Sequence, residues 1–464
     1  MSTSGQPADG MRRMVVVGAG PAGIRAAQTL VHHGVRPVLI DEAPAPGGQI
    51  YRQAPPGRAR SPRSQYGFEW RKAAAIHRAG AELARQSDYR PGTTVWNAAP
   101  GLLDVQDGQG IGVQPYERLL LATGATDRVL PFPGWTLPGV FTLGGAQVAL
   151  KAQQCVLGPR IVFAGTGPLL YLVAYQYARA GAQVAAVLDS SPGAGSVRTA
   201  LLMARQPALL VKGAYYVAWL RAHRVPLYTC ATLQEAQGNG RVDGVTARWR
   251  GRSLSLACDA LATGYGLRSE TQLADLLGCE FAFDADFRAW LPRMDADGRS
   301  SVPQIYLAGD GAGIGGADLA ELAGELAALA MLRDQGVRVD ESRMAGLRQR
   351  VARARGFRRA LEGRFPLPAA LARECPDDVP ICRCEEILVG EARQVACQQQ
   401  TRDPNRLKAL ARVGMGMCQG RMCQTGAAEI LADCAGVDIG QVGRLRAQAP
   451  VKPLVLREFS ERRP

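Results

Sequence analysis

The sequence predicts an α/β protein with two nucleotide-binding units, the second inserted in the first, and a small cysteine-rich domain at the C-terminal end. Two βαβ patterns support this prediction, one starting at Met14 and one at Ile161, because each joins a short apolar strand to a glycine-rich turn and a helix. Four cysteines, spaced C-x-C and C-x₄-C, then lie between Cys382 and Cys423. With 464 residues, the chain is long enough for about three domains.

The composition predicts a globular protein and excludes several classes. The chain is 47% hydrophobic and 21% charged, with a net charge of +14 that comes mostly from scattered arginines. No basic run is interleaved with aromatic residues, so we expect no nucleic-acid partner. The uncharged stretch 161–178 contains a G-x-G-P turn, which favours strand, turn and helix over a transmembrane helix. The start lacks the apolar segment of a secretory signal, so the eleven cysteines are expected in the cytoplasm as thiols or metal ligands.

The first βαβ unit has the spacing of a dinucleotide-binding fingerprint. Gly18 makes the tight turn after the strand, Gly20 lets the backbone approach a pyrophosphate, and Gly23 lets helix and sheet pack closely. The helix N-terminus offers free N–H groups to phosphate. The second strand ends at an acidic residue that can accept hydrogen bonds from a ribose, with the next residue as the alternative. The candidate cofactor-binding residues here are Gly18, Ala19, Gly20, Pro21, Ala22, Gly23, Asp41 and Glu42.

Three further motifs favour FAD over NAD in this unit. "PGGQIY" follows at Pro46–Tyr51, "ATG" ends a later strand, and "GD" comes some 270 residues on. With these motifs the chain resembles the flavoproteins that have two dinucleotide-binding domains. The resemblance implies that the Gly-Asp pair contacts the ribityl chain and pyrophosphate, and that Gly-Gly-Gln lines the flavin. It adds Gly47, Gly48, Gln49, Ala122, Thr123, Gly124, Gly309 and Asp310 to the candidate FAD residues. Arg52 is a candidate for flavin or subunit contact, or else an ordinary surface arginine.

The second βαβ unit departs from the fingerprint at one position. Leu170 stands where the third glycine is expected, and a leucine there prevents the closest helix–sheet approach. Three interpretations stay open: a nucleotide of some kind, NAD(P) or ATP-like; a functional NAD(P)H site; or a structural domain without ligand. The candidate residues are Gly165, Gly167, Pro168, Leu169 and Asp189. No C-x-x-C lies near the flavin motifs, so a disulfide reductase is not expected.

The four C-terminal cysteines can hold either a structural zinc or a [2Fe–2S] cluster. Zinc sites favour C-x₂-C knuckles, whereas the C-x-C spacing is tighter, and Gly414, Gly416 and Gly420 bend the second loop so that N–H groups can point at sulfide. The spacing resembles the domain related to bacterioferritin-associated ferredoxin (BFD), although that prototype closes with C-x₂-C. The resemblance favours [2Fe–2S]. The candidate ligands are Cys382, Cys384, Cys418 and Cys423.

Over nearly its whole length the chain resembles the FAD-dependent α subunits of heteromeric amine or imino-acid dehydrogenases, which include opine oxidase, hydrogen cyanide synthase, and the D-hydroxyproline and L-proline dehydrogenases. The resemblance implies a partner β subunit, a flavoprotein of the amino-acid-oxidase type, that oxidises the C–N bond of an opine, hydroxyproline, proline or glycine-like substrate. Some members add a small ferredoxin-like subunit or FMN at a subunit interface. This chain would then relay electrons, with flavin-borne chemistry and no catalytic side chain.

Two alternatives remain beside the relay subunit. One is a self-contained NAD(P)H-dependent FAD/iron–sulfur reductase, and the other is a scaffold that only assembles a complex. The expected domains are a FAD-binding domain (11–150 and 286–340), a second nucleotide-binding-like domain (151–285), a helical linker (341–374) and a BFD-like [2Fe–2S] domain (375–440).

Overall fold

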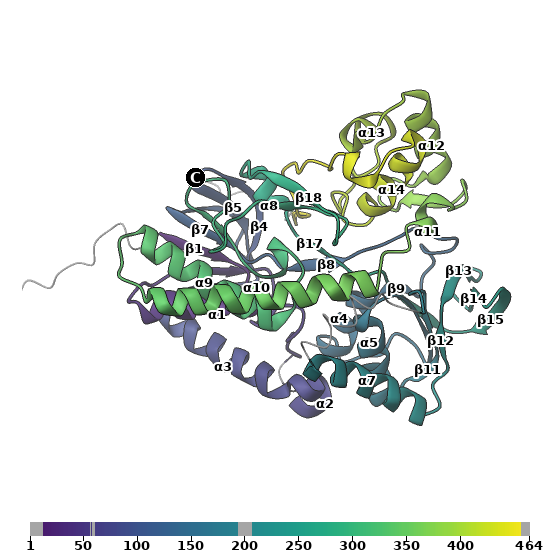
Figure 1. Cartoon of the computed structure of the whole chain (residues 1–464), viewed down its shortest axis with the longest axis horizontal. Coiled ribbons are helices and arrows are strands. Elements are labelled where there is room, and N and C mark those ends of the chain that lie inside the picture. Colours follow the sequence, from purple (N-terminus) through teal and green to yellow (C-terminus); the bar gives the residue numbers. More distant parts are fainter. Residues whose placement is uncertain (1–12, 56, 58–60, 194–206, 456–464) are drawn as a thin grey trace, which may run out of the picture.

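The computed structural model describes residues 13–55, 57, 61–193 and 207–455, so residues 11 and 12 of the expected FAD-binding domain lie outside it. Two α/β units and a helical C-terminal domain are separate lobes in Figure 1. The first unit has a parallel sheet with the order β20-β7-β1-β2-β3. Its strands are β1 (Met14–Val17), β2 (Val38–Asp41), β3 (Asp88–Pro91), β7 (Arg118–Leu121) and β20 (Ile305–Leu307). All residues of β1 and β2 are buried, as a parallel sheet covered on both faces requires.

Long helices cover one face of this sheet. Gly324 lets two of them touch, because a Cβ at this position would lie 2.1 Å from the carbonyl oxygen of Ala22. The helices are α1 (Pro21–His32), α3 (Trp70–Gln86), α9 (Ala317–Asp334) and α10 (Glu341–Arg364), with the short α2 (Pro62–Tyr66) and η2 (Gly67–Glu69) before α3. The other face packs against an antiparallel sheet, β4 (Thr94–Ala99), β5 (Leu102–Gln106) and β6 (Ile111–Pro115), and helix α8 (Gln272–Leu276).

The second unit repeats this plan with a parallel sheet of order β12-β11-β10-β16-β9. The strands are β9 (Val140–Thr142), β10 (Arg160–Gly165), β11 (Gln183–Asp189), β12 (Leu227–Thr229) and β16 (Ala260–Gly264). Helices cover one face, namely α4 (Leu143–Lys151), α5 (Pro168–Arg179) and α7 (Pro207–Ala222). The antiparallel β13 (Ala231–Gln237), β14 (Gly244–Trp249) and β15 (Arg252–Ala257) cover the other.

The second sheet lies within the first unit in sequence, because its strands β10–β16 come between β7 and β20, which pair with each other. An antiparallel pair, β8 (Ala125–Asp127) with β17 (Leu267–Ser269), joins the two units where the chain crosses between them. The second sheet begins before residue 151, since β9 is one of its strands. A hairpin, β18 (Phe281–Asp284) and β19 (Ala289–Pro292), precedes the return to the first sheet.

The C-terminal domain is helical, and α10 leads to it along the molecule (Figure 1). Its elements are α11 (Ala370–Arg373), β21 (Pro380–Cys382), β22 (Ile387–Leu388), α12 (Val389–Gln398), α13 (Pro404–Ala411), α14 (Gln424–Ala435) and η4 (Ile439–Gln441). After η4 the chain returns to the first unit, where the N–H of Val451 donates to the carbonyl oxygen of Trp96 at 2.9 Å. The last described residues therefore lie against the first sheet's antiparallel layer.

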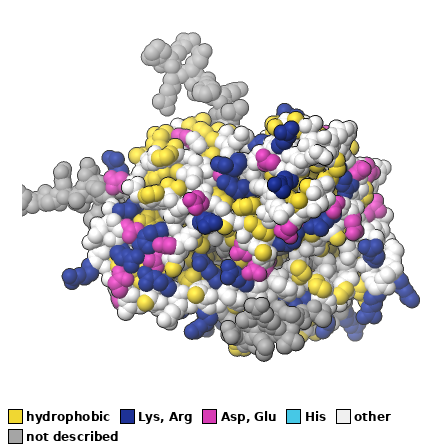
Figure 2. All heavy atoms as spheres, turned by 45° about the horizontal axis from the view of Figure 1, so that its top comes forward, with side chains coloured by type: hydrophobic (Ala, Val, Ile, Leu, Met, Phe, Trp, Pro, Cys, Tyr) yellow, Lys and Arg dark blue, Asp and Glu magenta, His cyan; other side chains and the backbone are white. Residues whose placement is uncertain are grey.

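Charge is dispersed over the surface drawn in Figure 2. Lys and Arg side chains there are interspersed with Asp, Glu and apolar side chains, and the described residues form no continuous basic stripe on this face. Within the described ranges, no helix combines the length and apolarity needed to cross a membrane. The stretch 161–178 forms most of β10, a turn and all but the last residue of α5, as the turn inside it predicts.

Candidate functional site

A cavity of about 490 Å³ lies at the carboxyl ends of the first unit's strands and extends to α4 and α5 of the second unit. This position is where open α/β sheets bind ligands. Thirteen of the sixteen candidate FAD residues line it together: Gly18, Gly20, Pro21, Ala22, Asp41, Glu42, Gly48, Gln49, Ala122, Thr123, Gly124, Gly309 and Asp310. The structure thus gathers motifs that are far apart in sequence around one space.

The glycines of the fingerprint shape this cavity by close backbone approach. A Cβ at Gly23 would lie 1.7 Å from the carbonyl oxygen of Gly18, so only glycine lets α1 begin this close to β1. A Cβ at Gly18 would meet the Ala122 oxygen at 2.3 Å. Gly23 therefore serves packing and does not line the cavity. The N-terminus of α1 has no side-chain cap, which leaves its N–H groups for a phosphate.

Asp41 and Glu42 differ in burial and in the groups that they contact. Asp41 is buried, and its carboxylate accepts hydrogen bonds from the N–H groups of Ala19 and Ala43, the latter at 2.7 Å. Burial raises the pKa of Asp41, and the two backbone donors oppose that rise. Ala19 is held by this contact and is not part of the cavity lining. Glu42 is exposed and pairs with Lys452 at 2.8 Å. Asp41 therefore fixes the glycine-rich turn as well as facing the cavity.

The Gly-Gly-Gln segment lies against the fingerprint. The N–H of Gly47 donates to the carbonyl oxygen of Ala19 at 2.9 Å, and a Cβ at Gly48 would lie 3.0 Å from Gly20. Gly47 does not line the cavity, and a Cβ there would lie 2.5 Å from the Tyr51 oxygen. Arg52 lines the cavity, and its buried Nε has no partner among the described residues. This placement fits a contact with the cofactor better than it fits a surface arginine.

A buried lysine supports the same loop and was not anticipated from the sequence. Lys151, at the end of α4, is 2% exposed, and its Nζ donates to the carbonyl oxygen of Ile50 at 3.0 Å. Burial lowers the pKa of Lys151 to about 8, and the nearby Arg52 charge adds to this effect. Two cations therefore lie beside the loop that is expected to line the flavin. A lone Lys at the end of a helix gives no sequence signal for such a role.

Gly309 and Asp310 close the cavity from the side of α9, within the 3₁₀ turn η3 (Gly309–Ala312). Asp310 Oδ1 accepts hydrogen bonds from the N–H groups of Gly315 and Gly316, both at 2.8 Å. Gly316 has a φ of +86° and precedes the first residue of α9. The carboxylate thereby shapes the loop that directs the N-terminus of α9 at the cavity, where the helix dipole favours negative charge.

Several candidate residues of the second unit make contacts within that unit. Leu169 lines the first cavity, and Leu170 is fully buried in the core under α5. The carboxylate of Asp189 is engaged internally, since it accepts from the hydroxyl of Tyr171 at 2.6 Å and from the N–H of Ser191 at 2.9 Å. Gly165 packs on Gly264, where a Cβ would meet the carbonyl oxygen at 1.9 Å, while Gly167 and Pro168 begin α5.

The four C-terminal cysteines form two contacting pairs. Cys382 of the C-x-C loop contacts Cys423, and Cys384 contacts Cys418 of the C-x₄-C loop. The hydrogen bond with the Cys423 thiol lowers the pKa of Cys382 to about 6. A Cβ at Gly416 would lie 2.2 Å from the Cβ of Cys384, so glycine lets the two loops meet. Within the described ranges, however, no three His, Cys, Asp or Glu residues are grouped so as to hold one metal ion.

One arginine connects the cysteine loop to the cavity, and sequence reasoning missed it. Arg421, between Cys418 and Cys423, lines the cavity and donates from Nε to Glu270 at 2.7 Å and from Nη1 to the carbonyl oxygens of Cys418 and Val451, at 3.2 and 2.5 Å. The backbone of Glu270 in turn accepts from, and donates to, the Ala-Thr-Gly segment. The buried Nη2 of Arg421 has no partner among the described residues.

Comparisons with known proteins agree with this geometry. Residues 12–331 match the family model described as pyridine nucleotide-disulphide oxidoreductase. The A subunit of opine oxidase from Rhizobium meliloti (strain 1021) is 36% identical over 96% of this chain and 98% of its own length. The hydrogen cyanide synthase subunit HcnB of Pseudomonas protegens is 35% identical over 96% of this chain and 97% of its own.

A solved structure extends the likeness to the whole fold. The crystal structure of L-proline dehydrogenase from P. horikoshii has a TM-score of 0.72 at 19% identity, and covers 96% of this chain and 78% of that one. The family and these flavoprotein relatives support FAD as the cofactor of the first cavity. The chain therefore belongs to the pyridine nucleotide-disulphide oxidoreductase family of flavin-dependent oxidoreductases and, within it, to the group that contains HcnB and the A subunit of opine oxidase.

Proposed function

We propose that this chain is the FAD- and [2Fe–2S]-containing electron-transfer subunit of a heteromeric dehydrogenase that oxidises the C–N bond of an amino or imino acid. The observation that carries the proposal is the position of Arg421, which belongs to the cysteine loop and also lines the FAD cavity. Two redox groups held by these two sites would lie on either side of one side chain. A relay subunit needs this proximity, whereas a scaffold does not.

The residues present fit both groups. The cavity offers the free N-termini of α1 and α9 to a pyrophosphate, with Arg52 and Lys151 near the flavin end to favour negative charge. The two cysteine pairs, Cys382 with Cys423 and Cys384 with Cys418, supply the four thiolates that two irons of a [2Fe–2S] cluster take. FAD exchanges electrons singly or in pairs, and the cluster exchanges them singly.

The chain's own residues would then bind and orient the cofactors and shield them from water. Asp41 and Asp310 hold the two loops that face the dinucleotide. Val451, brought back by the C-terminal segment, is buried against the first unit and lines the cavity, which excludes water there. No residue around the cavity is assigned to attack or deprotonate a substrate. Substrate oxidation is therefore placed mainly in a partner flavoprotein subunit of the amino-acid-oxidase type.

The relatives' names support a partner. They are subunits of opine oxidase and of hydrogen cyanide synthase, and this chain spans nearly the full length of both. A chain with the same extent would need a comparable partner to complete its activity. A small ferredoxin-like subunit, and FMN at the interface between subunits, are further parts that the proposal allows. The substrate would be opine-, hydroxyproline-, proline- or glycine-like.

The test is to co-express the chain with an amino-acid-oxidase-type partner from the same genome and to purify the complex. We expect one FAD and two irons per copy of this chain, and a [2Fe–2S] signal in electron paramagnetic resonance after reduction. Addition of the substrate should reduce the flavin and then the cluster. Cys418→Ser should remove the iron signal while the flavin absorbance stays, with the exposed Cys155→Ser as the control. A colourless, iron-free chain that still supports full activity would contradict the proposal.

The NAD(P)H-dependent alternative is tested on the isolated chain. Internal engagement of Asp189 by Tyr171 and the leucine at 170 argue against a working nicotinamide site. We expect stopped-flow mixing with NADH or NADPH to leave the visible flavin band unchanged on the timescale of turnover. Rapid loss of that band would favour a self-contained reductase instead.

A further inference from the structure

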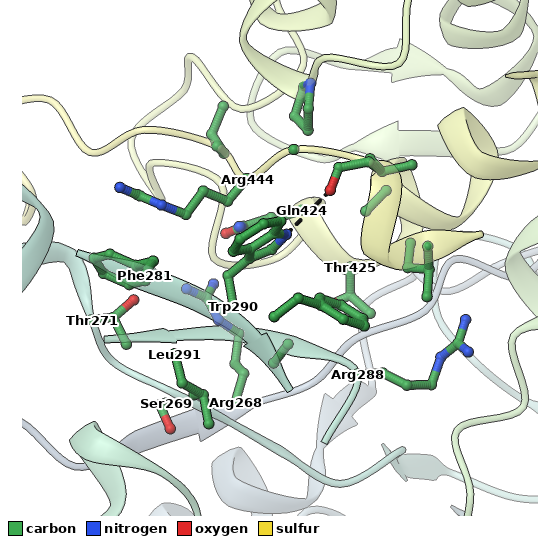
Figure 3. A pocket seen from close by; sticks show the side chains of 18 of the residues that line it. Arg268, Ser269, Thr271, Phe281, Arg288, Trp290, Leu291, Gln424, Thr425 and Arg444 are labelled. Carbon is green, nitrogen blue, oxygen red and sulfur yellow. Dashed lines mark hydrogen bonds between the residues drawn. The ribbon is translucent and has the colours of Figure 1, made fainter. Parts of the chain in front are cut away.

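A second cavity lies where the C-terminal domain meets the β18–β19 hairpin. It has a volume of about 100 Å³, several times the ~15 Å³ that one water needs. Figure 3 shows Trp290 in the middle of this pocket, with Arg268 reaching toward it from below and Gln424 beside it. Gln424 and Thr425 begin the twelve-residue helix α14, whose N-terminus has no side-chain cap. The cavity therefore receives the positive end of a helix dipole.

Arginines dominate the wall of this cavity. Five of them face only two carboxylates, Asp275 and Glu429. Three of the five are paired with these carboxylates: Arg288 with Glu429 at 2.6 Å, and Arg444 and Arg446 with Asp275 at 2.5 and 3.2 Å. In Figure 3 the guanidinium of Arg288 accordingly turns away from Trp290.

The other two arginines form no ion pair with a carboxylate in the part of the chain that the structure describes. Arg128 is 5% exposed, and its side chain donates to the carbonyl oxygen of Phe287 at 2.9 Å. Arg268 donates to the carbonyl oxygen of Arg421 at 3.3 Å. Burial lowers the pKa of both guanidinium groups, and the neighbouring arginine charges act in the same direction. The charge of Glu362 opposes this effect at Arg128, and the charges of Glu270, Cys423 and Cys418 oppose it at Arg268, without reversing it.

A buried cation without an anion is costly, because desolvation is not repaid by pairing. Guanidinium groups bind carboxylate and phosphate oxygens with two parallel hydrogen bonds, so a small oxyanion would satisfy both arginines at once.

We propose that this cavity is a binding site for an oxyanion group, a phosphate or a carboxylate, held by Arg128 and Arg268 at the N-terminus of α14. Its volume suits a single such group, either as a free ion or as the acidic end of a larger molecule. The site adjoins the cysteine loop, since Arg268 donates a hydrogen bond to the carbonyl oxygen of Arg421, and Gln424 follows Cys423. It is separate from the FAD cavity and does not depend on the proposed electron-transfer function.

The experiment uses the full, flavin-saturated chain, so that FAD occupies its own cavity. Binding of inorganic phosphate, acetate and AMP is measured by isothermal titration calorimetry at constant ionic strength in chloride. We expect at least one of the three probes to bind. Binding of phosphate or acetate alone identifies a free ion, and tighter binding of AMP that is weakened in the Arg268 variants identifies the phosphate of a larger ligand. No heat with any probe would overturn the proposal.

Variants distinguish binding in this cavity from nonspecific attraction of anions to a basic protein. Arg268→Met should weaken binding by about tenfold or more, since it removes a charge-assisted pair of hydrogen bonds. Arg268→Lys keeps the charge but loses the two parallel N–H donors of the guanidinium, so it should also weaken binding. This variant provides the test if the methionine variant fails to fold. Arg36→Met, at an exposed position, is the matched control and should bind like the wild type. Equal affinity in the Arg268 variants and the wild type would overturn the site.

Discussion

Arg421 donates from Nε to Oε2 of Glu270 at 2.7 Å, and both side chains are nearly buried. Arg421 belongs to the cysteine loop, and Glu270 is hydrogen-bonded through its backbone to Thr123 and Gly124 of the flavin cavity. The pair therefore fastens the C-terminal domain to the first unit. The Arg421 charge lowers the pKa of Glu270 against the opposing effect of burial. Because that pKa is depressed, the pair's stabilisation holds above the ordinary carboxyl pKa and is lost as the pH falls through the folded-state value.

Replacement of Arg421 should disturb both candidate sites together. Arg421→Met leaves the Glu270 carboxylate buried and unpaired, which costs about 3–5 kcal/mol. We expect the purified variant to lose flavin and iron in parallel, measured by absorbance and by metal analysis. Arg406→Met, an exposed arginine in the same domain, should retain both. If the variant keeps its flavin and loses only iron, Arg421 serves the cysteine loop alone.

The two acidic residues after β2 should differ in importance. Asp41→Asn replaces a carboxylate that accepts from Ala19 and Ala43, so it weakens charge-assisted bonds worth about 2 kcal/mol and loosens the turn that faces the dinucleotide. Glu42→Gln breaks a half-exposed pair with Lys452, worth about 0.5 kcal/mol. Fluorescence titration of the deflavinated protein with FAD should show a much larger rise in Kd for Asp41→Asn. Equal effects would assign the ribose contact to Glu42.

The two glycine-rich turns should respond in opposite ways to small substitutions. Gly23→Ala places a Cβ 1.7 Å from the Gly18 oxygen, so α1 must move and the chain should fail to retain FAD. Leu170→Ala instead empties part of a packed core and should cost about 2–5 kcal/mol in the free energy of unfolding without creating NADH oxidation. Denaturant unfolding and an NADH assay measure these outcomes. New NADH oxidation in Leu170→Ala would show that the leucine alone blocks a nicotinamide site.

Much of the first cavity could be predicted from the sequence because its motifs are local. The spacing of Gly18, Gly20 and Gly23 prescribes a strand–turn–helix whose geometry is nearly the same wherever it occurs. The placement of Gly48 and Asp310 around the same space required the resemblance to known flavoproteins, since nothing in the spacing itself brings them together. Leu170 predicts a wider second turn, because a leucine that is buried in the core has no room at the close approach seen at Gly23.

Long-range contacts could not be predicted in this way. Arg421 and Glu270 are 151 residues apart, and a single arginine among fifty carries no pattern that points to its partner. The return of the chain to the first unit at Val451 depends on tertiary packing after η4, where the sequence has no periodic signal. The burial of Lys151 could not be predicted for the same reason, because burial of a polar side chain is a property of the assembled units.

Lys151 should make stability depend on alkaline pH. Its folded-state pKa is about 8 against about 10.4 for an unfolded lysine, so the unfolded chain binds more protons between these values. The free energy of unfolding of the wild type should therefore rise by about 1.4 kcal/mol per pH unit across this range, relative to a chain without the lysine. Lys151→Met removes the buried charge and keeps the length of the side chain.

The measurement is the difference in unfolding free energy between Lys151→Met and the wild type, both loaded with flavin, at several pH values from neutral to alkaline. We expect the variant's relative stability to be greatest at neutral pH and to decline by about 3 kcal/mol on going to alkaline pH. Subtraction removes the titration of the thiols and tyrosines that both proteins share. Lys72→Met, at an exposed lysine, should show no such decline between about pH 8 and 10. A difference that is flat with pH would mean that bound flavin keeps Lys151 charged, as a cation paired with the cofactor.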